Sequence, residues 1–190
     1  MESAISSGWR SVQWWPALAG IGFAAFVALD LFHGDESGVD SAPVVAASGL
    51  VYLAAAALEK PWAAWPAFFL SVLVITVAKI GWADFDPTWG LIGVACAFAA
   101  YGLLRGAMRP ARDLPLQTIG MVGYGAVAVI ALILDGTAGA YLVAAGLLAH
   151  AAWDIHHHRT NRAVSRSLAE FCFVLDTLLA TAIIVATLWG

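Results

Sequence analysis

The residues best suited to chemistry lie in one short stretch, His150-Ala-Ala-Trp-Asp154-Ile-His-His-His158. On a helix with 3.6 residues per turn, His150, Asp154 and His157 share one face, because they stand at i, i+4 and i+7, and His158 lies at the edge of that face. Imidazole and carboxylate groups are ligands of zinc and of other first-row divalent metals. The stretch therefore predicts a helix that carries metal ligands on one side.

The following segment repeats the spacing with Cys172 and Asp176 at i and i+4. If the two segments form antiparallel helices around a turn near residues 162–163, His150 lies at the depth of Asp176, and Asp154 lies at the depth of Cys172. A thiolate would favour zinc or copper over harder ions. We therefore predict a transition-metal site, with zinc as the preferred ion, whose candidate ligands are His150, Asp154, His157, Cys172 and Asp176.

The number of ligands decides what such a site does. Four protein ligands would make a closed structural site, whereas three ligands and a water would leave an open catalytic position. In the catalytic case, Glu170, His157 and His158 are the candidates for moving protons. The non-metal interpretation is a hydrogen-bonded pair of His150 and Asp176 that holds two helices together.

The composition places these helices in a membrane. Hydrophobic residues make up 62% of the chain, charged residues only 12%, and the mean hydropathy is +0.83, whereas roughly 25% of residues are charged in an average soluble domain. A membrane-spanning helix needs about 20 apolar residues. We expect one all-α domain over residues 1–190, with a leading helix and three helical hairpins. Its seven spans are predicted at 14–33, 43–58, 62–82, 88–108, 115–135, 137–158 and 165–189.

The charges in the connecting segments predict the orientation. Lys and Arg collect on the cytoplasmic side of membrane proteins. With the N-terminus inside and the C-terminus outside, Lys79 is the only one of the nine basic residues on the outer side. The basic residues expected inside are Arg10, Lys60, Arg105, Arg109, Arg112, Arg159, Arg162 and Arg166. The acidic residues expected outside are Asp35, Glu36, Asp40, Asp84, Asp86 and Asp135.

The depth of the candidate ligands favours a functional role. At 1.5 Å per residue, His150 and Asp176 would lie on the order of 12 Å below the cytoplasmic boundary, where an unpaired carboxylate costs several kcal/mol. A second polar cluster, formed by Asp30, His33 and Lys79, is expected at the outer face. The two sets together permit an alternative, a pathway for a proton or a metal ion. Few polar residues are available for the middle of that pathway, namely Tyr52, Tyr101, Tyr124 and Thr76.

The two ligand-bearing segments also resemble a known pattern. They are similar to an uncharacterised family of bacterial multipass proteins, in which a helix ends in H-A-x-W-D-x-x-H-H and the next helix bears C-x-x-x-D. The resemblance covers only the last hairpin and implies no known reaction. Rhodopsins also have seven helices, but Lys60 and Lys79 are the only lysines here, and the last helix offers none for a retinal Schiff base.

These observations favour a multipass protein of a bacterial cytoplasmic membrane, with a metal site in the inner half of its last hairpin. We expect a metal-dependent hydrolase or lipid-modifying enzyme whose lipid-borne substrate enters from the side. A small proton- or metal-coupled transporter or channel is the first alternative, and a structural subunit of a membrane complex is the second. Membrane lipids and a second copy of the chain are the expected partners. Nucleic acid is not expected, because the net charge is −4 and no basic cluster is present.

Overall fold

The computed structural model describes residues 14–33, 37–82, 85–106 and 113–189. These residues form seven α-helices and two short 3-10 helices, and they contain no β-strand, so the all-α prediction is confirmed. In chain order the elements are α1 (Trp15–His33), η1 (Gly38–Ser41), α2 (Ala42–Leu58), η2 (Pro61–Ala63), α3 (Ala64–Gly81), α4 (Pro87–Leu104), α5 (Leu114–Leu134), α6 (Gly136–Thr160) and α7 (Arg166–Trp189).

Seven candidate membrane spans are found in the described part of the chain, each long and apolar enough to cross a bilayer. Their positions agree with the expected spans, with two differences. The second span begins at Gly38, because η1 leads directly into α2. The fourth helix ends at Leu104 instead of at 108, and Gly106 follows it with a φ of 70°. Six of the charges used for the orientation lie outside the described residues, namely Arg10, Asp35, Glu36, Asp84, Arg109 and Arg112.

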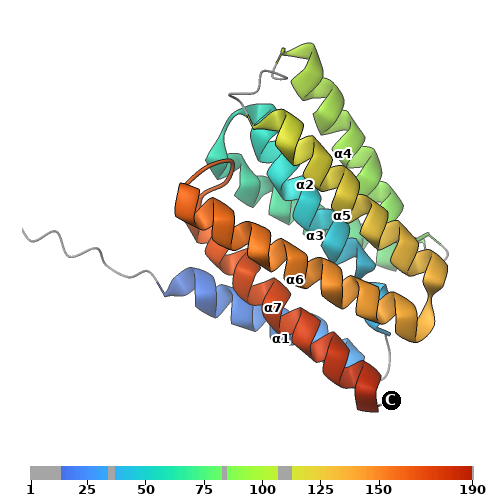
Figure 1. Cartoon of the computed structure of the whole chain (residues 1–190). Helices are drawn as coiled ribbons and strands as arrows, with labels where there is room; N and C mark the ends of the chain where they lie inside the picture. Colours follow the sequence, from blue (N-terminus) through green and yellow to red (C-terminus); the bar gives the residue numbers. More distant parts are fainter. Residues whose placement is uncertain (1–13, 34–36, 83–84, 107–112, 190) are drawn as a thin grey trace, which may run out of the picture.

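α2 is the central helix of the bundle. Its span is 89% buried, whereas the spans of α1, α4 and α5 are each 28% buried. α2 packs against α3, α4 and α5, while α1 packs on α7 and α7 packs on α6 (Figure 1). Its many small residues allow this position, because small side chains let neighbouring helix backbones approach closely.

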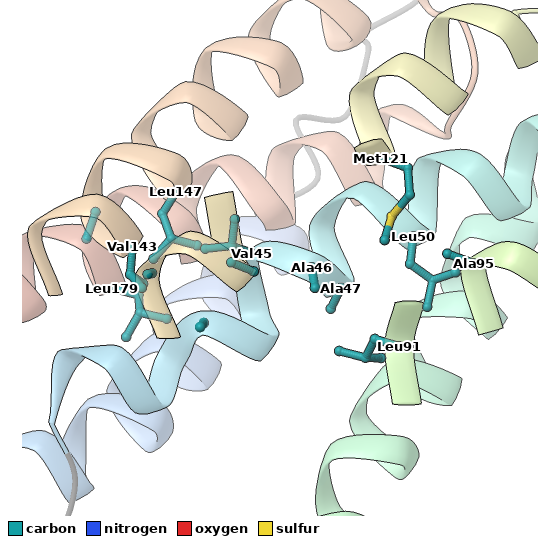
Figure 2. Packing of buried hydrophobic residues seen from close by; sticks show 14 of the residues in the cluster. Val45, Ala46, Ala47, Leu50, Leu91, Ala95, Met121, Val143, Leu147 and Leu179 are labelled. Carbon is teal, nitrogen blue, oxygen red and sulfur yellow. The ribbon is translucent and has the colours of Figure 1, made fainter. Parts of the chain in front are cut away.

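The core runs along α2 and between its neighbours. Val45, Val143, Leu147 and Leu179 belong to one buried hydrophobic cluster (Figure 2). The same cluster includes Leu50, Leu91 and Met121. The outer surface is apolar as well: Phe26, Ile80 and Leu104 are 68%, 83% and 87% exposed. Large apolar side chains over the outside of a bundle are compatible with a lipid environment. The described helices therefore suggest a multipass membrane protein.

Two glycines permit the close helix contacts that frame the last hairpin. A Cβ added at Gly20 of α1 would lie 2.7 Å from the carbonyl oxygen of Phe171 on α7. A Cβ added at Gly146 of α6 would lie 2.8 Å from Val127 of α5. Both distances are too short for a side chain, so glycine at these positions brings α7 against α1 and α6 against α5.

Candidate metal site

The site lies between α6 and α7, which form an antiparallel hairpin (Figure 1). α6 ends at Thr160, and Asn161 follows in the left-handed region with a φ of 53°, a conformation that asparagine tolerates well. The turn is held by Arg162, whose guanidinium donates to Asp113 over 2.8 Å, and α7 begins at Arg166. This turn sets the register that the sequence predicts, because it places His150 opposite Asp176.

Three of the predicted ligands meet in the interior. The Nδ1 atom of His150 donates to Oδ2 of Asp176 over 2.8 Å and lies 3.3 Å from Oδ2 of Asp154. Ligand atoms of all three residues lie within 4.8 Å of one another. The side chains are 0%, 0% and 1% exposed for His150, Asp154 and Asp176. This His/Asp/Asp trio can therefore hold a metal ion within the described part of the chain.

Tyr52 of the central helix completes the surroundings of the trio. Its hydroxyl donates to Oδ1 of Asp154 over 2.6 Å, and its ring meets the His150 imidazole edge-on at a centroid distance of 5.2 Å. Tyr124 of α5 contacts the same imidazole at 4.9 Å. In the sequence, both tyrosines were candidates for a pathway only and not for the metal site. The sequence feature that indicates a contact for Tyr52 is its lone hydroxyl in an otherwise apolar part of the helix, because a buried tyrosine usually has a hydrogen-bond partner.

Each member of the trio has one buried polar atom with no hydrogen-bond partner among the described residues: His150 Nε2, Asp176 Oδ1, and Asp154 Oδ2, which lies 3.3 Å from His150 Nδ1. Neither carboxylate forms an ion pair with a lysine or arginine in the described structure. Buried charges are normally paired or bound to a metal. The nearest basic group is His150, which can supply at most one positive charge for two buried carboxylates, so full neutralisation needs a divalent cation or a second proton.

His157 lies on the same face of α6 but outside the trio. Its Nδ1 donates to the carbonyl of Trp153 over 3.0 Å, and its Nε2 accepts from the amide of Gln117 over 3.1 Å. Both ring nitrogens are therefore occupied, and neither lone pair is free for a metal. The ring instead packs against Tyr52 at 4.9 Å. Gln117 of α5 was not a candidate in the sequence, where its isolated amide in an apolar helix was the available signal.

Cys172 is buried on α7 and is not part of the trio among the described residues. It belongs to a hydrophobic cluster that includes Tyr52, Phe171 and Leu175. Unoxidised cysteine often behaves as a small apolar side chain in such surroundings. The structure therefore brings together the His and Asp ligands of α6 and α7, while the Cys172 thiol packs in the hydrophobic cluster beside them.

His158 and Glu170 lie beside the trio. Together with Asp154 they line a pocket of about 340 Å³ between α6 and α7, and Arg159 lies on the same pocket. His158 is exposed, and Glu170 is half-buried. Two of the three residues predicted to move protons therefore border a cavity that one of the predicted ligands also lines.

The outer polar cluster is assembled only in part. Asp30 of α1 and Lys79 of α3 line one cavity, which also contains Asp40 and Thr76. His33 turns back on its own helix, because its Nδ1 donates to the carbonyl of Leu29 over 2.7 Å.

No protein family model, no curated protein and no solved structure matches this chain. The class of protein is therefore defined by the geometry of its fold and of its site. The described residues form seven apolar helices that are compatible with a membrane and a buried cluster of one histidine and two aspartates.

Replacing Tyr52 with phenylalanine should weaken metal binding by about 10- to 100-fold, the usual cost of losing a hydrogen bond that orients a ligand. The substitution removes the only hydroxyl that donates to Asp154 in the described structure and keeps the ring. Zinc affinity measured by competition with a chelating dye checks this. Tyr124→Phe is the matched control, because its ring contacts His150 while no hydrogen bond from its hydroxyl to the trio is found among the described residues. Equal affinities for the two variants would contradict the role of Tyr52.

Proposed function

We propose that His150, Asp154 and Asp176 bind a divalent transition metal ion, with zinc preferred. The observation that carries this proposal is a buried trio in which one ligand atom of each residue lies within 4.8 Å of the others, while each residue also has a buried polar atom with no hydrogen-bond partner in the described structure. A divalent cation neutralises both carboxylates and occupies lone pairs that no described residue uses. Imidazole and carboxylate donors suit zinc, whose catalytic sites have three protein ligands and one open position.

We further propose that the site is catalytic and hydrolytic. A metal ion with an open position can activate a bound water as a nucleophile. Glu170 supplies a carboxylate at the edge of the same pocket as Asp154, and His158 supplies an imidazole there. These are the residue types that commonly transfer protons in hydrolysis.

The position of the pocket favours a lipid-borne substrate. Ile155 and Phe173 line it and are 37% and 36% exposed on the outside of the bundle, so it opens sideways between α6 and α7. With the predicted orientation, this opening lies toward the cytoplasmic side, near the level of the lipid headgroups. Arg159 at its rim suits an anionic headgroup, because a guanidinium binds phosphate well.

Transport of protons or metal ions is the second candidate function. Tyr52, Asp154, His150 and Asp176 form a connected set of polar groups in the interior. Ionisable residues inside a membrane bundle are also typical of proton relays. This function predicts that a change at Asp30, on the outer cavity, lowers flux as strongly as a change at Asp176.

The hydrolase proposal is tested with zinc-loaded protein in phospholipid vesicles, where the release of fatty acid or headgroup is followed by mass spectrometry. We expect Glu170→Gln to lower turnover by at least about 100-fold, the usual contribution of a general acid or base, without loss of bound zinc. Glu59→Gln is the control, since Glu59 lines a different pocket. Turnover that is unchanged in Glu170→Gln would contradict its role. The transporter would be favoured by two results together. Zinc-loaded protein would form no product, and it would carry a zinc or proton flux that Asp176→Asn abolishes.

A further inference from the structure

A second cavity, whose lining includes none of the metal trio, lies on the side of the bundle formed by α1, α2 and α3 and reaches Leu175 of α7. Its volume is about 320 Å³, and its walls come from α1 and α3, with residues of α2 such as Val44 and Ala47 as its floor. Phe26 on one wall and Ile80 on the other are 68% and 83% exposed. The cavity is therefore a groove that is open to the outside of the bundle along its length.

Aromatic side chains lie at one end of this groove, where Phe23 and Phe68 also line a neighbouring cavity of about 420 Å³. Phe23 of α1 meets Phe68 of α3 at a centroid distance of 5.4 Å, and Trp15 meets Trp65 at 5.5 Å. Beyond Phe23 and Phe68 the two helices no longer touch through aromatic rings, and the groove occupies the space between them. The aromatic end lies near the middle of α1 and in the first half of α3, and the open end, which Asp30 and Lys79 line, lies toward the predicted outer surface.

The length of the groove matches one leaflet of a bilayer. From Phe68 to Lys79 along α3, the rise of 1.5 Å per residue gives about 16 Å. Half of a hydrocarbon core of about 30 Å is about 15 Å. Apolar side chains, among them Phe26, Val27 and Ile75, line this stretch. An extended acyl chain therefore fits the groove in both length and polarity.

Charged groups of both signs lie at the open end. Asp30, Asp40 and Lys79 line the groove there, so two carboxylates and one ammonium group face the same space. The hydroxyl of Ser37 and its backbone N–H both donate to Oδ2 of Asp40, over 2.9 and 2.7 Å, which fixes that carboxylate in place. A headgroup that carries an ammonium and a phosphate complements this arrangement, with its ammonium toward the carboxylates and its phosphate toward Lys79.

A buried hydroxyl adds an independent observation. Ser41 lines the groove beside Asp40 and is 2% exposed, yet its Oγ has no hydrogen-bond partner among the described residues. An unpartnered buried hydroxyl costs free energy. An acceptor such as an ester carbonyl, at the junction between a headgroup and its acyl chains, would satisfy it at the depth where Ser41 lies.

We propose that this groove, bounded by Phe23, Asp30, Ser41, Phe68 and Lys79, binds one glycerophospholipid of the outer leaflet through its acyl chain and a zwitterionic headgroup with a primary ammonium. The site is separate from the metal trio and does not depend on the proposed hydrolase activity. It holds a lipid as a bound component of the protein, between α1 and α3.

Native mass spectrometry of the protein released from membranes of equal phosphatidylethanolamine and phosphatidylglycerol content tests this. Thr76→Trp fills the groove from its exposed wall, and Val77→Trp places the same bulk on the next residue, which lies outside the groove. We expect wild type and Val77→Trp to retain phosphatidylethanolamine, and Thr76→Trp to retain at least tenfold less. Equal retention by the two variants, or a change in oligomeric state without a change in bound lipid, would overturn the proposal.

A second variant tests the headgroup and leaves the groove open. Asp30 is exposed, so Asp30→Asn should not disturb the fold. We expect it to remove the preference for phosphatidylethanolamine over phosphatidylglycerol while total bound lipid changes little. Asp135→Asn, at the start of α6 and outside the groove, should leave the preference intact. A preference that survives in Asp30→Asn would contradict the proposed recognition of the ammonium group.

Discussion

Metal-free protein in which His150 is replaced by alanine should lose about 3–5 kcal/mol of stability, the usual cost of removing one partner from a buried charge pair. In the described structure, Nδ1 of the His150 imidazole donates to Asp176 over 2.8 Å and lies 3.3 Å from Oδ2 of Asp154. Without it, Asp176 has no hydrogen-bond partner in the described structure. Thermal unfolding in detergent with a chelator present measures the loss.

His156→Ala is the control for this prediction. His156 lies on the same helix but is exposed, and its removal leaves the trio unchanged. Exposed surface substitutions usually change the free energy of unfolding by no more than about 0.5 kcal/mol. We therefore expect the unfolding temperature of His156→Ala to stay close to that of wild type. If His150→Ala and His156→Ala unfold at the same temperature, His150 does not hold the two buried carboxylates.

The double variant Asp154→Asn, Asp176→Asn should have the opposite effect on the metal-free protein. It removes two buried negative charges that have no lysine or arginine partner in the described structure. A buried charge without a full counter-charge carries a large desolvation cost, so the neutral side chains should leave the metal-free protein at least as stable as wild type. At the same time it removes two of the three metal ligands, so added zinc should no longer stabilise the protein.

The comparison with and without zinc makes this prediction specific. A ligand present at 1,000 times its dissociation constant stabilises the folded state by about 4 kcal/mol. We expect zinc to raise the free energy of unfolding of wild type by that amount and to leave that of the double variant unchanged. Thermal unfolding at increasing zinc concentrations measures both changes. Ser48→Ala, on the central helix and away from the trio, should keep the full shift. A double variant that is less stable than wild type in the chelator would show that the carboxylates serve the fold and not a ligand.

Much of this arrangement could be predicted because it depends on short-range patterns. The apolar runs predict the spans, and the polar turn between the last two predicts their register. That register, together with a spacing of i and i+4, is sufficient to bring His150 and Asp154 to Asp176. A helical hairpin joined by a short turn leaves few other choices of depth.

The remaining contacts involve helices that are distant in the sequence. Tyr52 and Asp154 are 102 residues apart, and their hydrogen bond exists because α2 is the central helix. The sequence does not indicate this position, since a membrane helix can be apolar on every side and its pattern then does not show which face is interior. His157 illustrates the same limit. It shares the face of His150, but Gln117 of α5 and the Trp153 carbonyl occupy its nitrogens.

The metal content of the purified protein tests the central claim most directly. Protein in detergent is loaded with zinc, passed over a desalting column, and analysed by elemental mass spectrometry beside the Asp154→Asn, Asp176→Asn variant. The account predicts close to one zinc ion per chain in wild type and almost none in the variant. Wild-type protein that retains no zinc or other transition metal, or a variant that retains as much as wild type, would contradict a metal site at His150, Asp154 and Asp176.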